Sequence, residues 1–190
     1  MNWAFITYYT ESYRKYFDRL HASCFKHRCT LLPVFLKSSG SWVQNCANKP
    51  RVIQHFIENA HDAFDLLVWI DADATVESYP FLFDDFDAPL GVAKVWHRPH
   101  WEFLSGTLPV NRWTGRAIID AWVRKQALEQ NTWDQKVLQE LLETGEFDYV
   151  DLDPAYCCIF DKQEQLEACN HQPVILHHQA SREMKRLKRV

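Results

Sequence analysis

Residues 65–76 read DLLVWIDADATV, and the rest of the chain is best interpreted outward from this stretch. Five apolar residues, 66–70, run directly into Asp71 and Asp73. A continuous apolar run of this length is typical of a strand that is buried on both faces of a sheet. Two carboxylates at positions i and i+2 point the same way, where their charges repel each other. The stretch predicts a central strand followed by a cation site; the alternative is a strand that ends in an exposed Asx-turn.

The segments before this strand alternate between strand and helix patterns. Apolar runs rich in strand-forming residues occupy 3–9 and 30–36, and apolar residues at helical spacing mark 12–27 and 49–60. The order β-α-β-α-β favours a mostly parallel sheet with helices on its faces. Ligands of such sheets bind beyond the carboxyl ends of the strands.

The second half of the chain departs from this alternation. It predicts strands and helices in a mixed order: strands at 90–95, 103–110, 147–150 and 156–160, and helices at 114–129 and 133–142. Gly106 interrupts the second of these strands, at 103–110, and permits a ligand to approach Gly106 and Thr107 closely, whereas a β-bulge is the alternative explanation. The sequence thus predicts one compact α/β domain over residues 1–190, with a mixed, mostly parallel sheet flanked by helices.

Composition excludes several classes of protein. The 190 residues are 47% apolar and carry a net charge of −4, which argues against a dedicated nucleic-acid-binding surface. Only five glycines occur, and neither a G-x-G-x-x-G motif nor a P-loop is present. The six cysteines form no C-x-x-C pair, the N-terminus has no secretory pattern, and no apolar run reaches the roughly 18 residues of a membrane span. These features predict a cytoplasmic protein without a zinc ribbon.

Residues 173–186, PVILHHQASREMKR, offer a second set of ligands. Three apolar residues lead into His177 and His178, whose side chains diverge, so at most one of them is expected in a given site. A neutral imidazole is a sound ligand for Mn²⁺. Arg182 and Lys185 share a face if the segment is helical, and could grip a diphosphate. An exposed polar tail is the alternative interpretation.

Residues 131–142, NTWDQKVLQELL, predict a helix with acidic and amide side chains in its first turn. Asp134 and Gln135 occupy that turn. Complementarity with the helix dipole explains Asp134 without any function. This segment alone therefore does not assign a catalytic role to Asp134 or Gln135.

Taken in order, four motifs resemble the GT-A-fold glycosyltransferases that use nucleotide-diphospho-sugars, and most closely the branch of glycogenin and the bacterial lipopolysaccharide galactosyltransferases. WIDADATV is similar to that branch's W/Y-L-D-A-D-x-x-V, and FLSGTLPVN to its F-N-S-G-x-x-x-x-N. WDQKVL resembles D-Q-x-x-L, and LHHQASR resembles I-H-F-x-G-x-x-K. The resemblance covers nearly the whole chain.

The resemblance implies roles for named residues. The D-x-D aspartates Asp71 and Asp73, with His177 as the first histidine after the apolar strand, would hold Mn²⁺ or Mg²⁺ against the diphosphate. The other implied contacts are the base and ribose at Thr7, Tyr8 and Thr10, the phosphates or donor sugar at Lys49 or Arg51, and the donor sugar and acceptor at Asp134 and Gln135. Residues 1–76 would then be the nucleotide-binding half, and residues 77–190 the acceptor half with the metal- and phosphate-binding segment.

The implied function is metal-dependent transfer of a sugar from a nucleotide-diphospho-sugar to an acceptor hydroxyl. A UDP-sugar is the expected donor. The D-Q motif favours retention with Gln135 at the reactive face of the sugar, whereas Asp134 as a base would give inversion. The sequence does not select the class of acceptor, which is a saccharide, a lipid-linked glycan, a protein or a modified nucleobase. Two departures are Ala180 in place of the family's glycine and a short acceptor half. A Mg²⁺-dependent nucleotidyltransferase or phosphotransferase, and a non-catalytic nucleotide-sugar-binding module, remain the alternatives.

Overall fold

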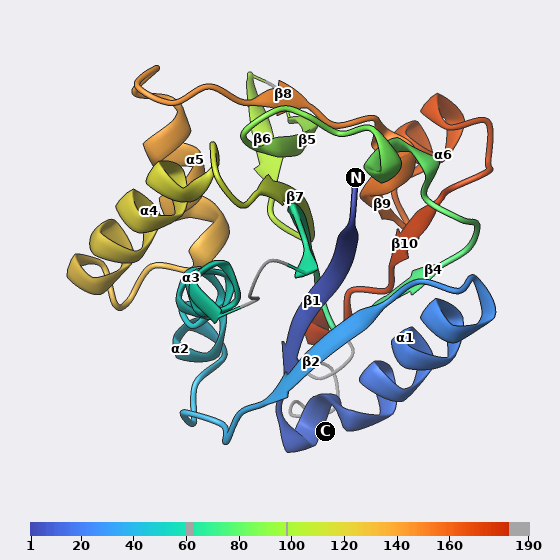
Figure 1. Ribbon diagram of the computed structural model, residues 1–190, viewed down its shortest axis with the longest axis horizontal. Coiled ribbons are helices and arrows are strands. Elements are labelled where there is room, and N and C mark those ends of the chain that lie inside the picture. The colour runs from blue at the N-terminus through green and yellow to red at the C-terminus, as the bar shows by residue number, and fades with distance from the viewer. Residues whose placement is uncertain (60–62, 98, 183–190) are drawn as a thin grey trace.

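The central feature of the computed structural model (Figure 1) is a four-stranded sheet in the order β2-β1-β3-β7. Its strands are β1 (Trp3–Tyr9), β2 (Leu31–Phe35), β3 (Leu66–Ile70) and β7 (Thr107–Asn111). The first three run parallel, and β7 pairs antiparallel with β3. The structure describes residues 1–59, 63–97 and 99–182. The predicted α/β class with a mixed, mostly parallel sheet is confirmed.

Helices cover both faces of this sheet, with α1 on one side and α3, α4 and α5 on the other (Figure 1). The helices are α1 (Arg14–Lys26), α2 (Trp42–Cys46), α3 (Lys49–Asn59), α4 (Arg116–Leu128), α5 (Asp134–Leu142) and α6 (Gln163–Ala168). Alternate residues of β3 enter opposite cores: Leu67 and Trp69 pack with α3, α4 and α5, while Val68 and Ile70 pack with α1. The uninterrupted apolar run follows from this double burial.

Two smaller sheets complete the fold. Strands β5 (Gly91–His97) and β6 (His100–Leu104) form a hairpin, and β8 (Val150–Asp151) pairs with β5. The third sheet has the order β4-β10-β9, made of β4 (Ala74–Val76), β10 (Ile175–His177) and β9 (Cys158–Ile159). In the antiparallel pairing of β10 with β4, His177 lies opposite Ala74. This register brings β10 to the turn that holds the two aspartates.

Several predicted elements were wrong in detail. The single strand expected at 103–110 is two strands, β6 and β7, because the chain breaks at Ser105 and Gly106. The strands expected at 147–150 and 156–160 shrink to β8 and β9, of two residues each. Helix α2, strand β4 and helix α6 were not predicted, since segments this short carry no periodic signal. Short 3₁₀ turns at Glu11–Tyr13, Phe81–Asp84 and Pro154–Tyr156 connect the elements.

All six cysteines are free thiols. Over residues 1–59, 63–97 and 99–182, every helix is too short or too polar to cross a bilayer.

Candidate active site

The turn after β3 places Asp71 and Asp73 beside β7. The amide of Asp71 donates to the carbonyl of Gly106 at 2.9 Å, and the Asp71 carbonyl accepts from Ala74 at 3.0 Å, which closes the turn. The indole N–H of Trp69 donates to the Asp71 carboxylate at 2.8 Å. The Asp73 carboxylate accepts from the amide of Ala180 at 2.7 Å, so it ties the C-terminal segment to this turn.

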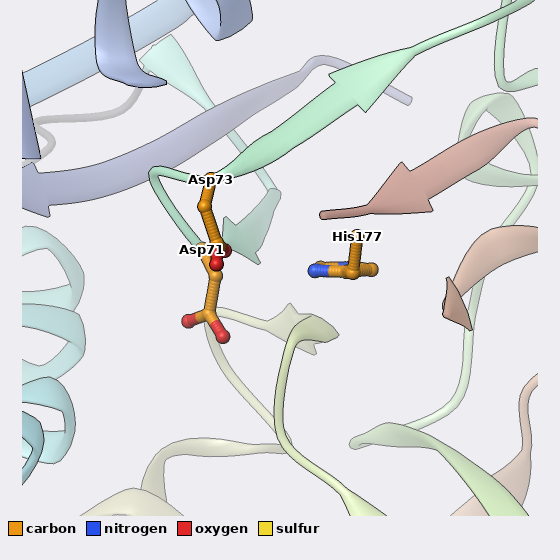
Figure 2. A group of neighbouring side chains, drawn as sticks. All are labelled: Asp71, Asp73 and His177. Carbon is orange, nitrogen blue, oxygen red and sulfur yellow. The ribbon is translucent and has the colours of Figure 1, made fainter. Parts of the chain in front are cut away.

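His177 approaches the two aspartates from β10. The ligand atoms of Asp71, Asp73 and His177 all lie within 4.8 Å of one another, and Figure 2 shows the imidazole edge directed toward the carboxylates. The Thr107 hydroxyl lies 2.9 Å from Nε2 of His177 and fixes the orientation of the ring. The neighbouring His178 turns away, with its Nε2 2.9 Å from the Thr75 hydroxyl. The structure thus brings together one histidine and both aspartates.

The electrostatics of this group suit a divalent cation. Loss of hydration, and after it the charge of Asp71, raises the pKa of Asp73 to about 6. Burial, and after it the charge of Lys49, lowers the pKa of His177 to about 3, so the imidazole is neutral at physiological pH. Two carboxylate oxygens and a neutral imidazole nitrogen form a hard-to-borderline ligand set that fits Mn²⁺ or Mg²⁺. The repulsion between the carboxylates is what a bound cation relieves.

Lys49, at the start of α3, links these aspartates to α5. Its ammonium lies 2.6 Å from the Asp134 carboxylate and 3.1 Å from that of Asp71. It also donates to the carbonyl and the hydroxyl of Ser105, both at 2.9 Å. The Ser105 hydroxyl in turn donates to Asp134 at 3.0 Å. Lys49 and Asp134 are buried, so the two charges compensate each other inside the protein.

Gln135, the next residue of α5, connects this network to the hairpin strand β6. Its amide oxygen accepts from the Ser105 amide at 3.3 Å, and its amide nitrogen donates to the Glu102 carboxylate at 2.8 Å. Both side chains line the same cavity as Asp71 and Asp73. That cavity has a volume of about 380 Å³.

Some of the residues predicted for the site line the cavity, and others do not. The cavity is lined by eight of them: Tyr8, Thr10, Lys49, Asp71, Asp73, Asp134, Gln135 and Arg182. His177, Gly106 and Thr107 lie behind this lining, and Thr7 is fully buried in β1. Arg51 lies at a different depression beside Gln126, whereas Lys49 lines the same cavity as Asp71. Lys185 lies outside the described residues.

Other lining residues were not predicted. They include the aromatic residues Tyr13, Trp42 and Trp133, the carboxylate of Glu102, and Ser105. Ser105 had a signal, because it directly precedes the glycine that interrupts the strand-like run. The others had none, since their position depends on how separate elements pack.

Gly106→Ala is expected to displace the imidazole of His177. An alanine Cβ would lie 2.7 Å from Cε1 and 3.0 Å from Nδ1 of that ring, which the Thr107 hydroxyl holds in place. Such overpacking costs about 1–3 kcal/mol of folding free energy. Thermal unfolding should show a lower Tm, and titration with Mn²⁺ a weaker affinity. An unchanged affinity would show that the ring is not held against Gly106.

The solved structures described here that align with this chain are glycosyltransferases. A glycosyltransferase involved in the glycosylation of the major capsid of PBCV-1 aligns with a TM-score of 0.71 and 15% identity, over 93% of both chains. GlyE of Streptococcus pneumoniae TIGR4 aligns with a TM-score of 0.62 and 17% identity, over 92% of this chain and 54% of GlyE. The galactosyltransferase LgtC, in complex with donor and acceptor sugar analogues, aligns with a TM-score of 0.60 and 12% identity, over 93% of this chain and 87% of LgtC.

No protein-family model and no curated protein matches the sequence. The likeness is therefore one of architecture, and it extends along nearly the whole chain. The chain has the GT-A glycosyltransferase fold, as the resemblance of its four motifs implied.

Proposed function

We propose that this protein is a metal-dependent glycosyltransferase that moves a sugar from a nucleotide-diphospho-sugar, most suitably a UDP-sugar, to an acceptor hydroxyl. The observation that carries the proposal is the convergence of Asp71, Asp73 and His177 within 4.8 Å, at a cavity in a GT-A fold. The neutral imidazole in the ligand set favours Mn²⁺ over Mg²⁺. When bound, the ion neutralises charge that develops on the leaving diphosphate.

The chain's own cations have separate tasks in this proposal. Arg182 lines the cavity and is well placed to pair with a phosphate oxygen, after leaving the Asp161 carboxylate to which it donates in this structure. Lys49 is already committed to two carboxylates and holds Asp71 and Asp134 at fixed positions. Tyr8 and Thr10, at the carboxyl end of β1, are assigned to the nucleoside.

The surroundings of Asp134 support retention of configuration. An inverting enzyme needs a carboxylate that is able to take the proton of the acceptor hydroxyl. The Asp134 carboxylate is buried, ion-paired with Lys49 at 2.6 Å and hydrogen-bonded to Ser105 at 3.0 Å, so it is already engaged in contacts within the protein. Gln135, which carries no charge, is the residue of this pair assigned to the reactive face of the donor sugar.

The cellular location is proposed from the thiols. All six cysteines are free, and five of them are buried, as expected for a protein of the reducing cytoplasm.

The proposal is tested by incubating the protein with Mn²⁺ and a panel of UDP- and GDP-sugars, with mixed acceptors, and measuring release of the nucleotide. Release of UDP from one sugar donor supports it, and NMR of the new linkage then gives the anomeric configuration. Release of pyrophosphate or phosphate instead would indicate a nucleotidyltransferase or phosphotransferase. Donor binding without any release would indicate a binding module.

Arg182→Ala is expected to raise the KM for the sugar donor about tenfold, because a hydrogen bond to a charged group contributes about 1.5–3 kcal/mol. The measurement is the initial rate of nucleotide release over a range of donor concentrations. Arg124→Ala is the matched control, since Arg124 is an exposed arginine of α4 outside the cavity. Equal KM values for the two variants would contradict the role of Arg182.

A further inference from the structure

Two of the tryptophans that line the cavity, Trp42 and Trp133, are partly exposed. Trp122 is buried in the core, and Trp69 is almost fully buried although it also lines the cavity, whereas Trp42 and Trp133 are 40% and 41% exposed within the same lining. Their ring centroids lie 6.5 Å apart at an interplanar angle of 46°. The indoles therefore present apolar surface to the cavity.

Polar contacts stabilise helix α2, which carries Trp42. This helix has no buried residue, and the Ser41 hydroxyl caps it by accepting from the Gln44 amide at 3.1 Å. Asn45 further accepts from the amide and the hydroxyl of Ser39, at 2.9 and 2.7 Å. A five-residue helix that adds nothing to the core but holds an indole at a cavity points to a binding role for that indole.

Polar groups lie beside the second tryptophan. Trp133 directly precedes Asp134 and Gln135, and Gln135 donates to the Glu102 carboxylate at 2.8 Å. Both Gln135 and Glu102 line the cavity. The site thus combines two aromatic surfaces with a carboxylate and an amide, a set of groups that suits a ligand with one apolar face and a rim of hydroxyls.

We infer that Trp42 and Trp133, with Glu102 and Gln135, form an acceptor subsite for a pyranoside. The C–H face of the sugar ring packs on the indoles, and its hydroxyls bond to the carboxylate and the amide. The inference rests on the proposed function for the placement of the donor: the diphosphate lies at Asp71 and Asp73, and the donor sugar at Asp134 and Gln135. The tryptophan pair adjoins that sugar by way of Trp133, whereas the nucleoside belongs to the end of β1.

This assignment selects a saccharide from the acceptor classes that the sequence left open. An acyl chain requires a continuous apolar groove, whereas the cavity that the two tryptophans line also contains the carboxylate of Glu102. A glycan carried on a lipid or a protein presents the same pyranose chemistry at its end. The experiment therefore uses free glycosides, which contain that chemistry alone.

The test is saturation-transfer NMR on the whole chain, without donor, with a panel of methyl pyranosides and disaccharides. Binding with the strongest transfer to the hydrogens of one face of the ring is expected. Trp42→Ala and Trp133→Ala should each weaken binding about tenfold, a loss of the size expected for an aromatic stacking contact. Trp133→Phe keeps an aromatic surface and should retain an intermediate affinity, which separates stacking from misfolding.

Trp96 supplies a matched control. It is 43% exposed, pairs with Trp101 at a centroid distance of 5.1 Å, and lies outside the cavity lining. Trp96→Ala should bind the glycoside as the unchanged protein does. A second arm adds UDP with Mn²⁺, which should leave the glycoside bound.

Four results would overturn the inference: no glycoside binds, Trp133→Ala binds as well as the unchanged protein, Trp96→Ala loses binding to the same extent, or UDP displaces the glycoside. The last result would assign the tryptophans to the nucleobase. Because the glycoside is titrated without donor, its binding can be lost or kept independently of nucleotide release, so failure of this inference is distinct from failure of the proposed function.

Discussion

Asp73→Ala is expected to abolish release of nucleotide from a sugar donor and to weaken Mn²⁺ binding more than about 100-fold, beyond the loss typical of an outer-shell partner. The reason is that Asp73 supplies one of three ligand atoms grouped within 4.8 Å. Isothermal titration with Mn²⁺ and the nucleotide-release assay give the two values. Asp148→Ala, which removes an exposed carboxylate from a loop outside the cavity, is the control.

A second variant separates the metal from the fold around it. The Asp73 carboxylate also accepts from the Ala180 amide at 2.7 Å, so alanine removes that tie as well. Asp73→Asn keeps an oxygen for this bond but removes the charge. Loss of Mn²⁺ binding in both variants, with Tm preserved in Asp73→Asn, supports the ligand role. Full activity in either variant would refute it.

Lys49→Met is expected to lower the free energy of unfolding by about 3–5 kcal/mol, the loss typical when one member of a buried ion pair is removed. The substitution leaves the buried Asp134 carboxylate without the ammonium that lies 2.6 Å away, and removes two bonds to Ser105. Unfolding in urea, followed by circular dichroism, gives the value. Nucleotide release should fall too, because Asp71 loses a contact that positions it.

Two further variants make this prediction specific. Lys49→Met combined with Asp134→Leu should recover part of the lost stability, since the uncompensated charge is then gone. Lys125→Met removes an ammonium that pairs with Glu129 and Glu140 on the partly exposed surface, and should lower the free energy of unfolding far less than Lys49→Met. If Lys49→Met and Lys125→Met are equally stable, the buried network is not what holds α3 to α5.

The sequence predicted those elements whose apolar pattern reports their burial. Strand β3 is fully apolar because both of its faces are covered, and α3, α4 and α5 show helical spacing because one face of each meets the core. The two aspartates were recognisable from their place at the end of such a strand. His177 was recognisable because it follows a second apolar run.

What could not be predicted depends on contacts between distant elements. Lys49 and Arg51 are both basic residues of the first turn of α3, and nothing in their order tells which one faces the cavity; packing of that helix decides it. Trp42 lies in a helix too short to show a period. The role of Ser105 becomes visible only when Lys49, Asp134 and Gln135 are seen around it.

The pairing of β10 with β4 also has a consequence for the order of folding. His177 lies opposite Ala74, although more than half of the chain lies between them. During synthesis the first three strands and both aspartates leave the ribosome well before the histidine does. The ligand set proposed for the ion therefore stays incomplete until β10 pairs with β4. Pairing of β10 with β4 is the step that would complete the metal site on which the proposed function depends.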